Sequence, residues 1–111
     1  MAAKRFGAEN LFQDVDTVLL EGAANTNSTM NIRFVNRNSI TARVRLALVD
    51  EPAATAIANL EVEDYLEFDA PVGSNDVLEE LGIAVPAGFS IVVRADENNV
   101  NVIAYGFEEN C

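Results

Sequence analysis

The chain has 111 residues, half of them hydrophobic, which suffices for one domain with its own buried core. Seven basic residues against eighteen acidic ones give a formal charge of −11. We therefore expect no nucleic-acid partner, because phosphate binding depends on lysine and arginine. No leader is recognisable and no apolar run approaches the roughly 18 residues of a spanning helix, so we expect a soluble protein without a membrane partner.

Several chemistries are excluded by composition. The chain has no histidine, and its single cysteine is Cys111, so it offers no Ser-His-Asp arrangement, zinc cluster or intrachain disulfide. The doublets Glu79-Glu80 and Glu108-Glu109 could supply the acid and base of a glycosidase. Neighbours on a strand point to opposite faces, however, so we favour an acidic surface. The prediction is a protein that is not an enzyme, with no catalytic residue, cofactor or metal.

The first residues are expected to form an arm outside the folded domain. Residues 1–13 show little strand pattern, which predicts an N-terminal arm followed by a sandwich domain over residues 14–111. Candidate contact residues on this arm are the basic and apolar side chains Lys4, Arg5, Phe6, Leu11 and Phe12. Leu11 and Phe12 could tuck against a sheet edge or a neighbour.

Strand-like segments then follow one another at short intervals. Residues 15–20 are a candidate first strand. Residues 29–35 and 40–49 alternate between apolar and polar side chains and are expected to pair as a meander. In that pairing Arg33, Arg43 and Arg45 would share one sheet face.

The middle of the chain is less regular. Residues 53–63 are interpreted as a connection that begins with a short helix or turn, although residues 59–63 alternate like a strand. Short strands are expected at residues 65–68, 77–81 and 83–85.

The last quarter predicts a hairpin. Residues 89–95 and 100–107 are rich in β-branched and aromatic side chains and flank the polar break at residues 96–99. The outward face of the final strand carries Ile103, Tyr105 and Phe107, which is too apolar for simple exposure. We expect this face to be covered by a neighbouring chain or by the N-terminal segment. Seven to eight short strands in all predict an all-β fold, an antiparallel β-sandwich or jelly roll.

An ordered set of phrases carries a resemblance that spans about residues 17–109. Together they resemble the small virion-associated β-sandwich proteins of tailed bacteriophages, especially those of marine and cyanobacterial phages. The phrases are Val35-Asn-Arg-Asn38, Ala42-Arg-Val-Arg-Leu-Ala-Leu48, Asp64-Tyr-Leu-Glu-Phe68, Leu78-Glu-Glu-Leu-Gly-Ile83, Pro86-Ala-Gly88 and Tyr105-Gly-Phe-Glu-Glu109.

The resemblance implies a structural protein of the virion, made in the host cytoplasm and placed on the outer capsid surface. A capsid decoration or cement protein would bind the major capsid protein of the same particle at capsomer junctions, and a homotrimer is the expected oligomer. The alternative is a tail or fibre domain that binds host-surface glycans. A third possibility is a calcium-binding domain that uses Asp14, Asp16 or residues 96–99.

Two accounts of the arginines stay open. Arg33, Arg43 and Arg45 could pair with carboxylates of the same subunit, such as Glu61, Glu63 or Glu67, which is the account we favour. They could instead dock an acidic rim on a neighbouring subunit.

Overall fold

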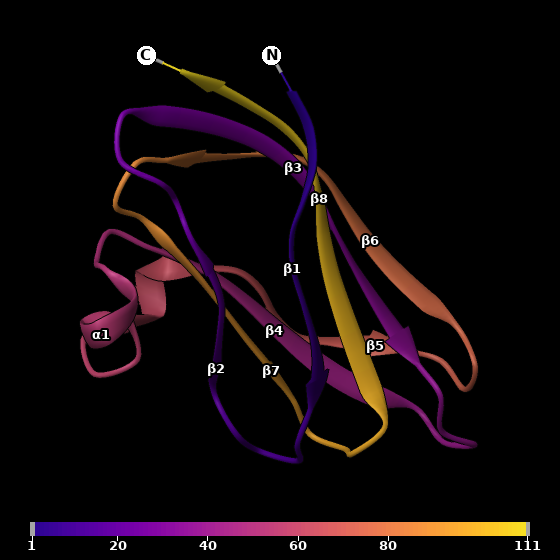
Figure 1. Ribbon diagram of the computed structural model, residues 1–111. Coiled ribbons are helices and arrows are strands. Elements are labelled where there is room, and N and C mark those ends of the chain that lie inside the picture. The colour runs from indigo at the N-terminus through magenta and orange to yellow at the C-terminus, as the bar shows by residue number, and fades with distance from the viewer. Residues whose placement is uncertain (1, 111) are drawn as a thin grey trace.

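The computed structural model describes residues 2–110, which form eight strands in two four-stranded antiparallel sheets (Figure 1). In spatial order the first sheet contains β1 (Ala2–Leu11), β8 (Val100–Asn110), β3 (Thr26–Asn36) and β6 (Val77–Pro86). Strands β1 and β6 are its free edges.

The second sheet packs against the first. In spatial order it contains β2 (Thr17–Glu21), β7 (Ser90–Ala95), β4 (Ala42–Val49) and β5 (Tyr65–Val72). Strand β1 pairs with β8, β2 with β7, β3 with β6 and β4 with β5, so the first half of the chain pairs with the second half. This is the strand arrangement of a jelly roll, and the predicted all-β sandwich is confirmed.

The core lies between the sheets and follows from the alternation in the sequence. On β3, the side chains of Met30, Ile32 and Phe34 are buried, whereas Thr29 and Arg33 are exposed. Period-two alternation places these two sets on opposite faces of the strand. Burying the apolar set against the second sheet removes it from water, which is the main force holding the sandwich together.

Two glycines fit the backbone where a larger residue would not. Gly106 on β8 lies so close to β3 that an added Cβ would overlap the carbonyl oxygen of Thr29. Gly82 has φ +68° within a bulge of β6, opposite the irregularity between Met30 and Ile32. Because Gly82 tolerates this conformation, the strand continues through the bulge, and the two predicted strands at 77–81 and 83–85 are one strand.

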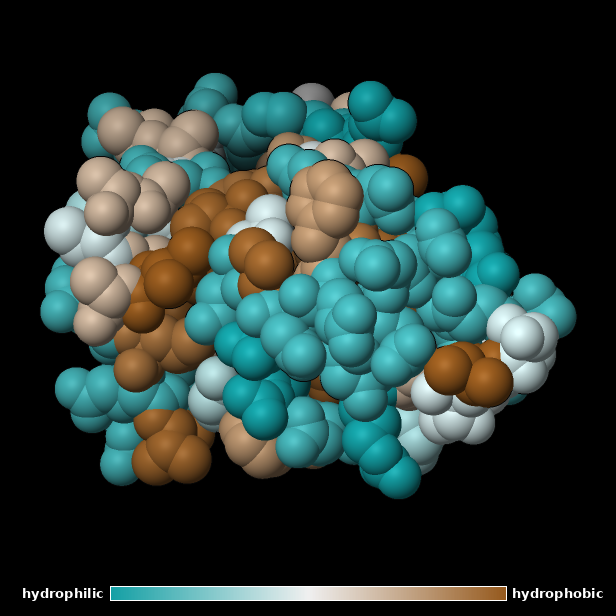
Figure 2. Space-filling view, turned by 90° about the horizontal axis from the view of Figure 1, so that it is seen from below, coloured by the Kyte–Doolittle hydropathy of each residue, from teal (hydrophilic) through white to brown (hydrophobic). Residues whose placement is uncertain are grey.

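Asparagine side chains join the loops at one end of the sandwich. The fully buried side-chain amide of Asn36 donates to the carbonyl oxygens of Ile40 and Val72 at 2.8 and 2.9 Å. Asn38 donates from Nδ2 to the carbonyl oxygen of Asn98 at 2.6 Å. These bonds tie the β3–β4, β5–β6 and β7–β8 connections together. Figure 2 looks at this end, which is hydrophilic over its centre, with apolar side chains gathered to one side.

The predicted pairing of the final hairpin is wrong, although both of its strands exist. Strand β7 lies between β2 and β4 in the second sheet, and β8 lies between β1 and β3 in the first. The loop at residues 96–99 therefore crosses from one sheet to the other. Likewise β3 and β4 belong to different sheets, so the predicted meander is wrong. Alternation identifies a strand but does not identify its partner.

The predicted arm is also wrong for the residues that the structure describes. Ala2–Leu11 form an edge strand paired with β8 over nine residue pairs, and Leu11 is buried in the core. The segment has little β-branched content, so its strand conformation comes from pairing with β8 rather than from its own propensity. Met1 and Cys111, the outer ends of the predicted ranges 1–13 and 14–111, lie outside the described residues.

Candidate functional site

The outward sides of the two sheets differ in what covers them. On the second sheet, the connection at residues 50–64 contains helix α1 (Ala53–Ala56) and the 3-10 helix η1 (Val62–Asp64). It packs over Ala47, Val49 and Val92, which are buried as a separate apolar cluster with Ala56. We call this outward side the covered face. The predicted short helix or turn at the start of this connection is confirmed, and residues 59–63 are not a strand.

The outward side of the first sheet, which we call the open face, has no such cover among residues 2–110. Phe107 is 50% exposed, and Ile103 and Tyr105 are half-buried. Strand register places the following side chains on the open face: Arg5, Ala8, Asn10, Asn27, Thr29, Asn31, Arg33, Val35, Val77, Glu79, Asn101, Ile103, Tyr105, Phe107 and Glu109.

The open face carries little net charge. Its ionisable groups, apart from Tyr105, are Arg5, Arg33, Glu79 and Glu109, together with Arg37, whose guanidinium donates to the side chains of Asn10 and Asn101 on this face. Three positive charges and two negative ones leave a formal charge of +1 on the open face. The whole chain carries −11. Excess negative charge therefore resides on the rest of the surface. Interface centres are typically enriched in aromatic residues, and the open face carries Tyr105 and Phe107 on its central strand β8.

A hydrogen bond joins two strands of the open face. The Tyr105 hydroxyl on β8 donates to Glu79 Oε2 on β6. This bond, followed by burial, raises the pKa of Tyr105. The Asn31 side chain, between these strands, accepts from the backbone N–H of Gly82 at 3.0 Å. Polar groups of the open face are thus partly paired within the subunit, which holds Tyr105 in one orientation.

The three candidate arginines do not share a face. Arg33 lies on the open face, whereas Arg43 and Arg45 lie on β4 in the second sheet, so the predicted common patch is wrong. The reason is the assignment of β3 and β4 to different sheets.

Arg45 has an intramolecular carboxylate partner. Its Nε lies 2.7 Å from Asp69 Oδ1, and its guanidinium lies 4.1 Å from the ring centroid of Phe68. The bond to Arg45 holds the pKa of Asp69 below its ordinary value. The partner is thus Asp69 rather than Glu61, Glu63 or Glu67. No sequence signal singled it out, because Asp69 sits at φ +55° in an irregular part of β5.

The candidate residues of the N-terminal segment have separate surroundings. Lys4 Nζ lies 2.8 Å from Glu108 Oε2 and 5.5 Å from the ring centroid of Phe6, which packs on the core. Arg5 is on the open face and Leu11 is in the core, whereas Phe12 is 66% exposed. Leu11 therefore serves the fold, and Arg5 and Phe12 stay available to a partner.

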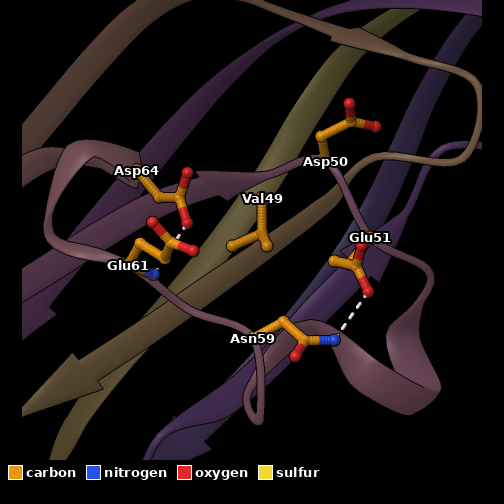
Figure 3. A pocket seen from close by; sticks show the side chains of 6 residues that line it. All are labelled: Val49, Asp50, Glu51, Asn59, Glu61 and Asp64. Atoms are coloured by element: carbon orange, nitrogen blue, oxygen red, sulfur yellow. Dashed lines mark hydrogen bonds between the residues drawn. The ribbon is translucent and has the colours of Figure 1, made fainter.

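An acidic depression of about 420 Å³ lies between the end of β4 and the covering connection (Figure 3). Val49 and Asn59 line it together with Asp50, Glu51, Glu61 and Asp64. Asn59 Nδ2 donates to Glu51 Oε1 at 2.8 Å, and the backbone N–H of Glu61 donates to Asp64. These bonds fix the connection, so the depression has a structural explanation.

The residues considered for calcium already interact with protein groups. Asp14 and Asp16 lie 3.8 and 3.5 Å from the guanidinium of Arg94. Asp96 accepts from the backbone N–H of Arg43. Over residues 2–110, no group of three or more His, Cys, Asp or Glu side chains is arranged to hold a metal ion. Within the same residues, no helix is both long and apolar enough to cross a membrane.

Comparison with known proteins gives no relative. No family model, curated protein or solved structure matches the chain.

Proposed function

We propose that this protein is a structural component of a phage particle, a decoration or cement protein that binds the assembled shell through the open face. The observation that carries the proposal is an uncovered sheet face of low net charge with partly exposed Ile103, Tyr105 and Phe107 in a chain of charge −11. The resemblance of the ordered sequence phrases to virion-associated β-sandwich proteins supports the same proposal.

The dimensions of the open face suit a specific contact. Four strands spaced about 4.8 Å apart and roughly ten residues long cover about 600 Å². A standard interface buries about 800 Å² on each partner. The open face therefore supplies most of one standard contact surface. The major capsid protein of the same particle is the proposed partner, on the outer capsid surface.

The mechanism is stabilisation by linkage. A protein that binds only the assembled lattice shifts the equilibrium towards that lattice, in proportion to its affinity and concentration. The charge excess outside the open face keeps the free protein soluble. It also disfavours contact of the exposed surface with packaged nucleic acid.

Co-sedimentation with shells of the major capsid protein tests the proposal. Wild-type protein should pellet with the shells, and Ile103→Ser should weaken pelleting at least tenfold, because it removes apolar area from the centre of the contact. Ile57→Ser is the matched control, since Ile57 is exposed on the covering connection. Equal pelleting of both variants, or no binding by the wild type, would contradict the proposal.

A second candidate function has one observation in its favour. Tyr65 and Phe68 pack edge to face with centroids 4.9 Å apart, Phe68 is 54% exposed, and Arg45 stacks on it. Exposed aromatic rings beside hydrogen-bonding groups suit sugar rings, as a tail or fibre domain would need. Glycan-array binding that Phe68→Ala abolishes, without shell binding, would establish this function instead.

A further inference from the structure

Four strands form the free edges of the two sheets, and they are protected to different degrees. Strand β6 carries Glu79, Glu80 and Pro86, and β5 carries Pro71. Strand β2 has only five residues. Charges, prolines and short length are the features that prevent an edge from pairing with another chain. Strand β1 is ten residues long and has no proline. It carries the charges Lys4, Arg5 and Glu9 and a bulge between Arg5 and Gly7, so a second chain can pair with it only in a register where these charges complement each other.

The charges of β1 are arranged to complement themselves. Under a two-fold axis an antiparallel β1–β1 pair can place Lys4 opposite Glu9 of a second copy, and Glu9 opposite its Lys4. Within the first sheet, Lys4 is opposite Gly106 and Glu9 is opposite Val102 on β8. The side chains of Lys4 and Glu9 therefore both lie on the inward side of the sheet. The β1–β1 register that places Lys4 opposite Glu9 also places Arg5 opposite Ala8 of the second copy. The side chains of Arg5 and Ala8 both lie on the open face. Side chains on matching faces are thus paired on both sides of the bulge between Arg5 and Gly7, which lies at the two-fold axis.

Neither Glu9 nor Arg5 has an ion-pair partner within residues 2–110, whereas Lys4 is paired with Glu108. A neighbouring Glu9 would add a second carboxylate beside the Lys4 ammonium. Opposite charges facing each other across strands are favourable, and like charges are unfavourable. The register with Lys4 opposite Glu9 is therefore preferred over registers that oppose like charges.

We propose that two copies of this chain associate through their β1 edges to form a continuous eight-stranded sheet. An isologous contact of this kind closes after two copies. Its two-fold axis stands perpendicular to the sheet, so both open faces lie on the same side of the dimer. The contact thus doubles the area of the open face and replaces the threefold ring expected from the sequence. It does not depend on shell binding.

Sedimentation velocity on the full chain tests the dimer. The wild type should sediment as a dimer and Glu9→Lys as a monomer, because lysines then oppose each other twice. Lys4→Glu should also be monomeric, and an equimolar mixture of the two variants should form a heterodimer. Glu63→Lys, the same charge change on η1, is the matched control and should stay dimeric.

Amide hydrogen exchange locates the contact. Amides of β1 should exchange faster in Glu9→Lys than in the wild type, whereas those of β5, a free edge of the second sheet, should not change. A wild type that is monomeric at every concentration, or an oligomer that Glu9→Lys leaves intact, would overturn the inference. Melting curves show whether each variant folds. Shell binding by a monomeric wild type would reject the dimer and retain the proposed function.

Discussion

The covered and open faces are built on sheets of the same size, yet the chain treats them differently. The connection at residues 50–64 seals Val49 and Val92 on the covered face, and Arg45 and Arg94 pair with neighbouring aspartates beside it. No such segment reaches Ile103 or Tyr105 among the described residues. A sheet face that leaves Ile103, Tyr105 and Phe107 partly exposed is where a partner is expected.

The largest expected difference between the faces is in packing. Val49 is 2% exposed, so Val49→Ala should lower the free energy of unfolding by about 2 kcal/mol through lost burial and a cavity. Val35 is half-buried on the open face, and Val35→Ala should lower it by less than about 1 kcal/mol. Chemical denaturation measures both.

The same two variants should affect shell binding in the reverse order. Val35→Ala should weaken binding and Val49→Ala should leave it unchanged once folded. Equal losses of stability for the two valines would show that the open face is packed as closely as the covered one, and the comparison would fail.

A smaller effect on folding stability is expected where the two sheets meet at their β5 and β6 edges. Glu80 is opposite Ile32 and Glu67 is opposite Leu46, so both point inward. Burial raises the pKa of Glu80, and hydrogen bonding with Glu67 raises it further. Folding therefore favours the protonated form, and stability falls as pH rises through the raised pKa.

Replacing the carboxyl by an amide removes this titration. Glu80→Gln should raise the melting temperature at pH 7, with little gain below the ordinary glutamate pKa of about 4.3. Thermal melts across this range measure the difference. A melting temperature that drops at pH 7 would show that ionised Glu80 stabilises the edge.

The smallest expected effect concerns the ion pair of Arg45 and Asp69. The lowered pKa of Asp69 means that the pair adds stability above the ordinary aspartate pKa and loses it as pH falls through the lowered value. Asp69→Asn should reduce the loss of stability at acid pH, with a small change at neutral pH because the pair is partly exposed to solvent. If stability falls with pH in the acid range as steeply in Asp69→Asn as in the wild type, the ion pair contributes nothing to stability.

The sequence predicted most strands because alternation is a local property. Residues 29–35 and 89–95 lie in or overlap β3 and β7, and the apolar outward side of β8 was recognised from Ile103 and Phe107. Strand β1 was missed because its alanines and glycine have little intrinsic strand preference, and pairing with β8 decides its conformation.

Partner choice could not be read from the sequence. The loops after β3 and β7 are short and polar, as in hairpins, but each crosses between sheets. Arg33 was therefore grouped with Arg43 and Arg45, although they face opposite sides of the sandwich. The role of residues 50–64 as a cover depends on the same tertiary arrangement, since it requires Val49 and Val92 to lie side by side on the second sheet.

A reconstruction of the decorated particle by electron cryo-microscopy tests the central claim most directly. It should show the open face, with Ile103, Tyr105 and Phe107, against the capsid protein, and the covering connection at residues 50–64 directed towards solvent. Density that places the covered face against the shell and leaves the open face in solvent would contradict the account.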